Sequence, residues 1–386
     1  MSEWSEKLMG ELCPIKKISV NPSKNADTLF HVYSLPAFDD GKRPEQALGK
    51  EIMSGKFAVK PGMILYNKLN VRFRRIWYIG ERVNESSICS TEFLPLVPNK
   101  CDQGFMYYFL LTQNFTDTMD SSHTGTSGSH QRIDVGFFSN QLVSIPLSRQ
   151  EQHNIAEVLF SLDDKIEQLN RNNATLEALA QTYFRQWFLE DNGNGPIPVS
   201  DMATLENNSV NPGRQPLEPF FHYSIPAFDN AQMPVVELGK AILSNKFCVL
   251  PSTILISKLN PVTPRIWRIG EAVQSNSVCS TEFQVLKPKD MRHYFFLYCL
   301  MKSNDVISSF TMSATGTSGS HQRIRPEYIL EVETPEPDKD KLSLFNEICT
   351  PMMERVKKNQ KQIQTLQKLR NTLLPKIISG EVKVKL

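Results

Sequence analysis

The sequence lacks the long apolar runs that a membrane-spanning protein needs. No run in its 386 residues approaches the ~18 consecutive apolar residues of a transmembrane helix. The opening MSEWSEKLMG has neither the basic start nor the apolar centre of a secretory signal. The seven cysteines form no Cys-x-x-Cys pair and include an odd member, which argues against a disulfide framework or a zinc site. We therefore expect reduced thiols, no metal and a cytoplasmic location.

Motifs for catalysis are also missing. The sequence has no Gly-x-x-x-x-Gly-Lys-Ser/Thr phosphate loop, no Gly-x-Gly-x-x-Gly dinucleotide loop and no Asn-Pro-Pro-aromatic tetrapeptide of the kind amino-methyltransferases use. His130 and His321 have no acid or nucleophile that the sequence places near them, and a histidine in a polar loop is more often a hydrogen-bonding residue than a catalyst. The net charge is only +2, so binding to nucleic acid would require a local concentration of basic residues. These absences predict a non-catalytic protein.

The chain is instead dominated by an internal duplication. Four motifs recur: Tyr33–Asp39 as Tyr223–Asp229, Arg75–Gly80 as Arg265–Gly270, Cys89–Phe93 as Cys279–Phe283, and the nonamer Gly125–Ile133 as Gly316–Ile324. The offset is 190 residues for the first three and 191 for the nonamer. A period this long indicates a duplicated domain, because solenoid repeats are roughly 20 to 50 residues long.

Each copy has the same order of predicted elements. Short runs rich in Ile, Val, Phe and Trp predict strands, and the aromatic segments 105–111 and 293–300 are compatible with helices. The Gly/Ser/Thr-rich nonamer follows as a loop or a helix entry, and a long helical segment ends each copy. We predict an α+β protein in which two duplicated, mixed α/β domains with pseudo-twofold symmetry are separated by a long antiparallel two-helix coiled coil. The predicted boundaries are 1–148 for the first domain, 149–190 for the first helix, 191–337 for the second domain, 338–379 for the second helix and 380–386 for the tail, with Gly380 as the helix C-cap.

The two long helices carry apolar residues at alternating spacings of four and three, which is typical of a coiled coil. The seam residues are Ile155, Leu159, Leu162, Ile166, Leu169, Asn173, Leu176, Ala180, Tyr183 and Trp187 in the first helix, and Phe345, Cys349, Met352, Val356, Asn359, Ile363, Leu366, Arg370, Leu373 and Ile377 in the second. An antiparallel register that pairs Asn173 with Asn359 matches nine of ten layers in polarity, with Leu162 opposite Arg370 as the exception. Charge agrees, because residues 149–191 have four basic against eight acidic side chains and residues 338–378 have nine against four. The result would be a spacer rod of ~50 Å, whereas ordinary amphipathic helices packed on globular domains are the alternative.

Two segments of each copy are candidates for contacts with DNA. One is a basic strand and loop interleaved with aromatic residues, and the other is the nonamer, which offers many hydrogen-bonding groups. The candidate residues are Lys68, Asn70, Arg72, Arg74, Arg75, Thr126, Ser127, Ser129, His130, Gln131 and Arg132 in the first copy, and Lys258, Asn260, Arg265, Arg268, Thr317, Ser318, Ser320, His321, Gln322 and Arg323 in the second. A solvated charged face and a structural turn are the alternative interpretations of these two segments.

Residues 145–166, IPLSRQEQHNIAEVLFSLDDKI, closely resemble the start of the spacer helix in specificity subunits of type I restriction-modification systems. The tail from Leu369 to Val384 and the Gly-Thr-Ser-x-x-x-Gln-x-Ile loop before each helix are similar to that family as well. The resemblance implies that each globular copy is a target recognition domain for one half of a bipartite DNA sequence. It also implies that the helices set the spacing and dock two modification subunits, and through these the restriction subunits. The partners would bind S-adenosylmethionine, ATP and Mg, methylate adenine in double-stranded DNA and cleave unmodified DNA, and this chain would bind no cofactor itself.

The shared loops lead to one more expectation. We predict half-sites that are related, inverted sequences and that differ where Val71–Arg74 corresponds to Pro261–Pro264. Two other functions remain open at this point. One is the DNA-reading portion of a fused endonuclease-methyltransferase with its own activity, and the other is a structural coiled-coil adaptor.

Overall fold

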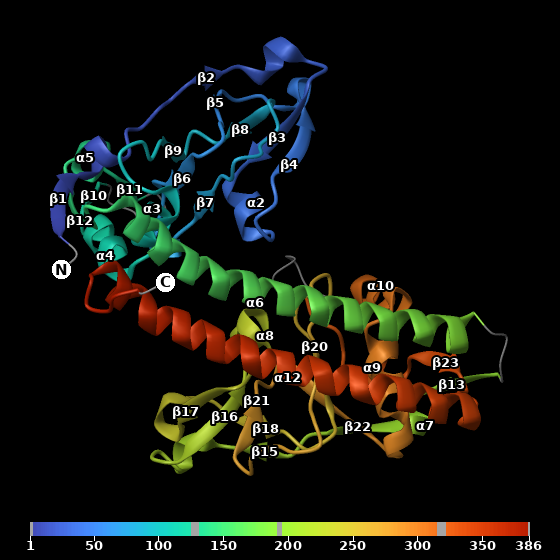
Figure 1. Ribbon diagram of the computed structural model, residues 1–386. Helices are drawn as coiled ribbons and strands as arrows, with labels where there is room; N and C mark the ends of the chain where they lie inside the picture. Colours follow the sequence, from blue (N-terminus) through green and yellow to red (C-terminus); the bar gives the residue numbers. More distant parts are fainter. Residues whose placement is uncertain (1–2, 125–130, 191–194, 315–321, 385–386) are drawn as a thin grey trace. The chain divides into compact units, whose positions relative to one another are not determined.

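The computed structural model describes residues 3–124, 131–190, 195–314 and 322–384. They form two compact units, residues 1–166 with 365–386 and residues 167–364. Each unit contains one globular copy together with part of both long helices, α6 (Arg149–Phe184) and α12 (Lys339–Ile378) (Figure 1). Within the described residues, no helix is long and apolar enough to cross a membrane.

The first globular copy is built on two sheets. A five-stranded sheet has the order β2 (Ser19–Val20), β5 (Lys56–Ala58), β8 (Ser87–Cys89), β3 (Leu29–Tyr33) and β4 (Glu45–Leu48), and a three-stranded sheet has the order β7 (Ile76–Tyr78), β6 (Ile64–Asn67) and β9 (Phe93–Leu96). Only the pairing of β3 with β8 is parallel in these two sheets. All four residues of β6 are buried, the apolar or aromatic Ile64, Leu65 and Tyr66 as well as the polar Asn67. Leu65, Trp77, Cys89 and Phe93 belong to one buried cluster that joins the two sheets.

The second globular copy repeats the order of these eight strands and adds one strand, β14 (Ala203–Glu206), at the edge of the smaller sheet, where the first copy has only an isolated bridge between Ile15 and Leu96. Its five-stranded sheet has the order β15 (Ser209–Val210), β18 (Lys246–Cys248), β21 (Ser277–Cys279), β16 (Pro219–Tyr223) and β17 (Val235–Leu238), and its other sheet has the order β14, β22 (Phe283–Pro288), β19 (Ile254–Ser257) and β20 (Ile266–Arg268). The parallel pair is again in the equivalent place, between β16 and β21. The predicted duplication is therefore confirmed at the level of sheet order.

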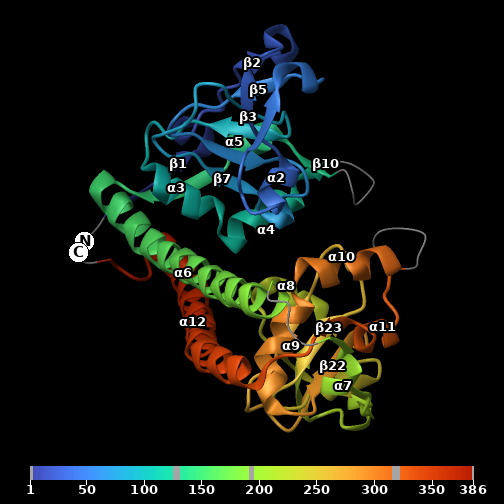
Figure 2. The same cartoon turned by 90° about the vertical axis from the view of Figure 1, so that its right-hand side faces the viewer.

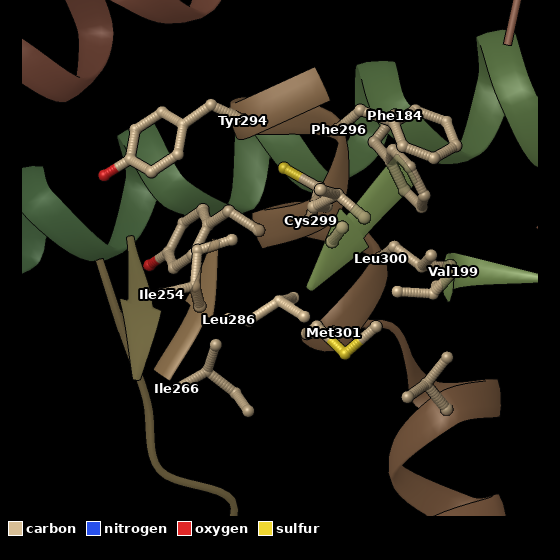
Figure 3. Packing of buried hydrophobic residues seen from close by; sticks show 14 of the residues in the cluster. Phe184, Val199, Ile254, Ile266, Leu286, Tyr294, Phe296, Cys299, Leu300 and Met301 are labelled. Carbon is tan, nitrogen blue, oxygen red and sulfur yellow. The ribbon is translucent and has the colours of Figure 1, made fainter. Parts of the chain in front are cut away.

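Two helices follow the sheets in each copy, and the first of each pair lies at the aromatic segment that the sequence marks as helix-compatible. They are α3 (Gln103–Leu110) and α4 (Gln113–Ser121) in the first copy, and α9 (Tyr294–Met301) and α10 (Asn304–Ser313) in the second. In the second unit α9 lies beside α6 (Figures 1 and 2), with the rings of Phe184 and Phe296 5.2 Å apart. Figure 3 shows Phe184 beside Phe296 of α9, with Ile254 and Leu286 of the sheet in the same buried cluster.

The remaining elements are short. They are α1 (Met9–Leu12), α2 (Leu35–Asp39), α5 (Val135–Ser139), α7 (Val199–Met202), α8 (Ile225–Ala231) and α11 (Glu327–Leu330), with the strand pairs β1 (Trp4–Leu8) and β12 (Leu142–Pro146), β10 (His123–Thr124) and β11 (Arg132–Ile133), and β13 (Pro196–Pro198) and β23 (Glu333–Pro335). One of the 3₁₀ turns, η3 (Val71–Phe73), lies in the basic loop between β6 and β7.

The two long helices pair in an antiparallel sense within each unit. In the second unit, Asn359 donates a hydrogen bond of 2.7 Å from Nδ2 to Oδ1 of Asn173, and the ring of Phe184 lies 6.4 Å from that of Phe345. In the first unit, Ile155 and Leu159 of α6 share a buried cluster with Ile377 of α12. The predicted Asn173–Asn359 layer is thus confirmed.

The structure corrects the predicted seam at two places. Met353, rather than Met352, is fully buried, and Phe184 and Phe188 are buried more deeply than Tyr183 and Trp187. Met353 lies between the seam residues Cys349 and Val356, which are buried as predicted, so its burial reflects packing on the globular domain. Toward the end of α6, a drift of roughly 20° per heptad against a strict seven-residue repeat also moves the buried face by one residue. This end of α6 packs on the globular domain as well as on α12, and it continues into the π-helical turn η4 (Arg185–Leu189).

Candidate nucleic-acid interface

The structure brings the two candidate DNA-contact segments of each copy together. In the first copy, the amide of Asn70 donates to the carbonyl oxygen of Gln131 (2.9 Å), and the amide of Ile133 donates to that of Lys68 (3.1 Å). In the second copy the equivalent backbone hydrogen bonds run from the amide of Asn260 to the carbonyl oxygen of Gln322 (2.9 Å) and from the amide of Ile324 to the carbonyl oxygen of Lys258 (3.1 Å). Asn70 and Asn260 both adopt a left-handed backbone conformation, with φ near 50°. The basic loop and the end of the nonamer therefore form one surface, built alike in both copies.

Eight predicted contact residues lie outside the described residues: Thr126, Ser127, Ser129, His130, Thr317, Ser318, Ser320 and His321. Their role in DNA binding stays a prediction.

The arginine near the end of each nonamer forms a bidentate ion pair inside its own domain. Nε and Nη2 of Arg132 donate to the carboxylate of Glu92 at 3.0 and 2.9 Å, and Arg323 contacts Glu282 at 3.1 and 3.0 Å. The Arg132 hydrogen bond, aided by the nearby charge of Lys68, holds the pKa of Glu92 below its ordinary value. Each pair joins two of the repeated motifs, the nonamer and the Cys-Ser-Thr-Glu-Phe segment.

A second bidentate pair joins the other two repeated motifs. Arg75 donates through Nε and Nη2 to Asp39, both at 2.7 Å, and Arg265 contacts Asp229 at 2.7 and 2.9 Å. Beside the first pair, the ring of Tyr33 lies 4.9 Å from that of Trp77 in an edge-to-face contact. The repeated motifs thus hold the domain together, and their arginines have structural partners.

Two further predicted contact residues reach other parts of the protein. Arg74 donates to the carbonyl oxygen of Leu111 (3.3 Å) and to the side chain of Gln113 at the start of α4. Arg268, at the end of β20, donates to the carbonyl oxygen of Met353 in α12 (3.0 Å). These arginines connect the basic loop to α4 and the second domain to the long helix.

The tip of the basic loop projects into solvent. Arg72 is exposed, and Phe73 is 55% exposed although it is a large aromatic residue. The guanidinium groups of Arg72 and Arg75 lie 5.2 and 4.9 Å from the centre of the Phe73 ring. In the second copy the equivalent tip exposes Val262, at 62%. This is where the two otherwise similar surfaces differ most in chemistry.

Sequence reasoning missed the acidic partners of these arginines. Asp39, Glu92, Asp229 and Glu282 all lie in repeated motifs, so a search for opposite charges retained between motifs could have found them. In the described part of the chain, no three His, Cys, Asp or Glu residues come together in a way that could hold a metal ion.

Comparisons with known proteins agree on one family. Residues 1–178 match the type I restriction modification DNA specificity domain. The type I restriction enzyme MjaIX specificity subunit of Methanocaldococcus jannaschii is 26% identical over 323 residues, which cover 72% of this chain and 69% of the relative. The HindI specificity subunit of Haemophilus influenzae is 27% identical over 201 residues, 49% of this chain and 42% of the relative.

A solved structure shares the fold. The S subunit of a type I restriction-modification system from M. genitalium aligns with 100% of this chain and 97% of its own, with a TM-score of 0.60 and 16% identity. The family match and the relatives show that residues 1–178 form a type I restriction modification DNA specificity domain and that the chain is similar to specificity subunits of type I restriction enzymes. The solved structure shows that the fold is shared along the whole chain.

Proposed function

We propose that each globular copy of this chain reads one half of a bipartite DNA target. The observation that carries the proposal is the repeated surface in which the basic loop and the end of the nonamer are joined by the same backbone hydrogen bonds. Basic groups on such a surface would meet phosphates and position the duplex, and the side chains at the loop tip would meet base edges.

The long helices would fix the separation of the half-sites and dock two modification subunits, which in turn would hold the restriction subunits. The buried Asn173–Asn359 contact supports the first role, because a polar layer in an apolar seam sets the register of paired helices. The excess of basic residues in 338–378 and of acidic residues in 149–191 supports the same pairing.

The chemistry of the complex would belong to the partner subunits. Specificity subunits are generally non-catalytic. The modification subunits would bind S-adenosylmethionine and methylate an adenine turned out of the base stack, and the restriction subunits would use ATP and Mg for cleavage. This chain would itself hold no cofactor and would act in the cytoplasm, where its free thiols stay reduced.

The test has two steps. The full-length chain should bind duplex DNA with an affinity that falls steeply as salt rises, because phosphate contacts release counterions. It should copurify with a modification subunit, and mapping of the methylated adenines should then give a two-part sequence with a fixed gap. Methylation of DNA by the purified chain alone would instead favour a fused enzyme, and an absence of salt-dependent binding would leave a structural adaptor.

A further inference from the structure

The backbone of the loop between β6 and β7 holds two side chains away from the protein. Left-handed conformations at Asn70 (φ 50°) and Arg74 (φ 47°) bracket η3, and the amide of Arg74 closes the turn on the carbonyl oxygen of Val71 at 2.8 Å. Val71 is buried and anchors the turn. Arg72 and Phe73 are consequently the residues that the turn presents to solvent.

The arginine side chains of this surface differ in their hydrogen-bond and ion-pair partners. Arg75 and Arg132 are held by carboxylates, and Arg74 is held by the side chain of Gln113 and a carbonyl oxygen. Within the described residues, Arg72 has no carboxylate partner and contacts the Phe73 ring. Among the described residues, no acceptor is hydrogen-bonded to its guanidinium group, and the cation–π contact restricts the exposed side chain before any ligand arrives.

The second copy keeps the first part of this turn with different side chains. Asn260 is again left-handed (φ 50°), and the amide of Thr263 closes on its carbonyl oxygen at 2.9 Å, as the amide of Phe73 does on that of Asn70 at 3.1 Å. Pro261 and Pro264 stiffen this turn. Val262 stands where the first copy has Arg72, and Thr263 stands where it has Phe73. The second tip offers methyl groups and one hydroxyl, and no cation.

We propose that Arg72 reads a guanine in the half-site of the first domain, while Val262 reads the methyl group of a thymine at the equivalent position of the other half-site. This inference rests on the proposed function. An arginine fork matches the O6 and N7 acceptors of guanine in the major groove, whereas an aliphatic side chain there can contact only the thymine methyl group. Phe73 packs against the neighbouring base edge and keeps the Arg72 fork in position. Arg74, Arg75 and Arg132 are positioning residues of the same surface.

The experiment is selection of bound duplexes from a randomised pool by the full-length chain, followed by sequencing. The wild-type chain should select guanine at one position of the first half-site and thymine at the equivalent position of the second. R72V should lower the preference for guanine there on the order of 10- to 100-fold and leave the other positions unchanged. R72K should restore the overall affinity but only part of the preference, because an ammonium group lacks the fork.

The reciprocal variant V262R/T263F is the matched test in the second copy. It should change the thymine preference of that half-site to guanine without altering the first half-site. If R72V lowers the affinity equally for all sequences, Arg72 is a phosphate contact and the inference is wrong, although the proposed function stands. If the wild-type chain selects no sequence at all, both fail.

Discussion

Asn359 of α12 donates a hydrogen bond to Asn173 of α6 from a position where only 2% of its surface is exposed. The neighbouring seam residues Val356 and Ile363 are buried and apolar. An amide pair in such a layer lowers stability relative to an apolar pair, but every other register would leave both amides against hydrocarbon.

We predict that N173L destabilises the protein by about 1–3 kcal/mol, because it leaves the Asn359 amide buried without its partner. N173L/N359L should recover that loss, so the double variant is the control for the packing of leucine at this layer. Urea unfolding midpoints measure both effects. A single variant as stable as the wild type would contradict a role for the amide pair.

The register itself is tested by cross-linking. I166C/L366C should form a disulfide in the wild-type background, because the register places these two seam positions opposite one another. In the N173L/N359L background, I166C/L373C should begin to cross-link as well, since position 373 lies one heptad from 366 and the polar layer no longer opposes the slip. Efficient cross-linking of I166C/L373C in the wild-type background would show that the register is wrong.

One layer of the predicted seam places an apolar residue opposite a charged one, and in the structure the charged side chain forms an ion pair. Arg370, which the register places opposite Leu162, donates to the carboxylate of Asp163, and this carboxylate also accepts a hydrogen bond of 2.8 Å from Tyr108 of α3. One carboxylate therefore joins both long helices to the first globular domain. In the second domain, Glu177 of α6 has the comparable position, with Tyr298 and Lys302 as its partners.

We predict that D163A destabilises the first unit by about 1–2 kcal/mol. The side chains of Asp163 and Arg370 are 30% and 31% exposed, so the loss should lie between those of exposed and buried ion pairs. R171A is the matched control, because the Arg171–Glu167 pair is 73% and 63% exposed and should contribute less than about 0.5 kcal/mol. Thermal unfolding of both variants would decide. If D163A and R171A destabilise the protein equally, the contacts among Tyr108, Asp163 and Arg370 contribute no more to stability than an exposed ion pair does.

The periods in the sequence predicted the large-scale organisation of the chain correctly. The offset of 190 predicted two domains of one topology, and the heptads predicted two long helices with Asn173 facing Asn359. It was wrong by one residue at Met352, Tyr183 and Trp187, because there the helices also pack on a globular domain that the heptad pattern does not contain.

At the candidate site, by contrast, the sequence did not reveal which side chains contact each other. Arg75 and Arg132 were grouped with Arg72 as DNA contacts on composition alone, but their carboxylate partners lie 36 and 40 residues away in sequence. Such pairings follow from the tertiary fold and have no local pattern. They also show that the repeated motifs pair with one another inside each copy, so their repetition is explained by a common scaffold. Related half-sites remain a prediction that only the mapped target can test.

The Glu92–Arg132 pair predicts a pH dependence. The pKa of Glu92 in the folded chain lies below its ordinary value of 4.5, chiefly because of the Arg132 hydrogen bond, so the ionised carboxylate favours folding. This contribution is complete above about pH 4.5 and is lost as the pH falls through the lower, folded-state pKa. E92Q should therefore lose less stability than the wild type as the pH falls below about 4.5.

Unfolding by urea at several pH values measures this difference. E354Q is the control, because Glu354 lies on the exposed face of α12. Its pH dependence should follow the wild type. If the free energy of unfolding of E92Q equals that of the wild type at every pH, the ion pair does not help to hold the end of the nonamer against the basic loop.

The last prediction concerns the end of α12. Gly380 has a φ of +77°, and a Cβ atom added to it would lie 2.8 Å from two ring atoms of Trp4. G380A should destabilise the first unit by more than the roughly 1 kcal/mol that the left-handed conformation alone costs, because the indole must also move. In the W4L background the clash is relieved and only the conformational cost remains, so G380A should be less damaging there than in the wild type. The four unfolding midpoints of this double-mutant cycle separate the two effects. A cost for G380A that is the same in both backgrounds would show that Trp4 does not pack against the end of α12.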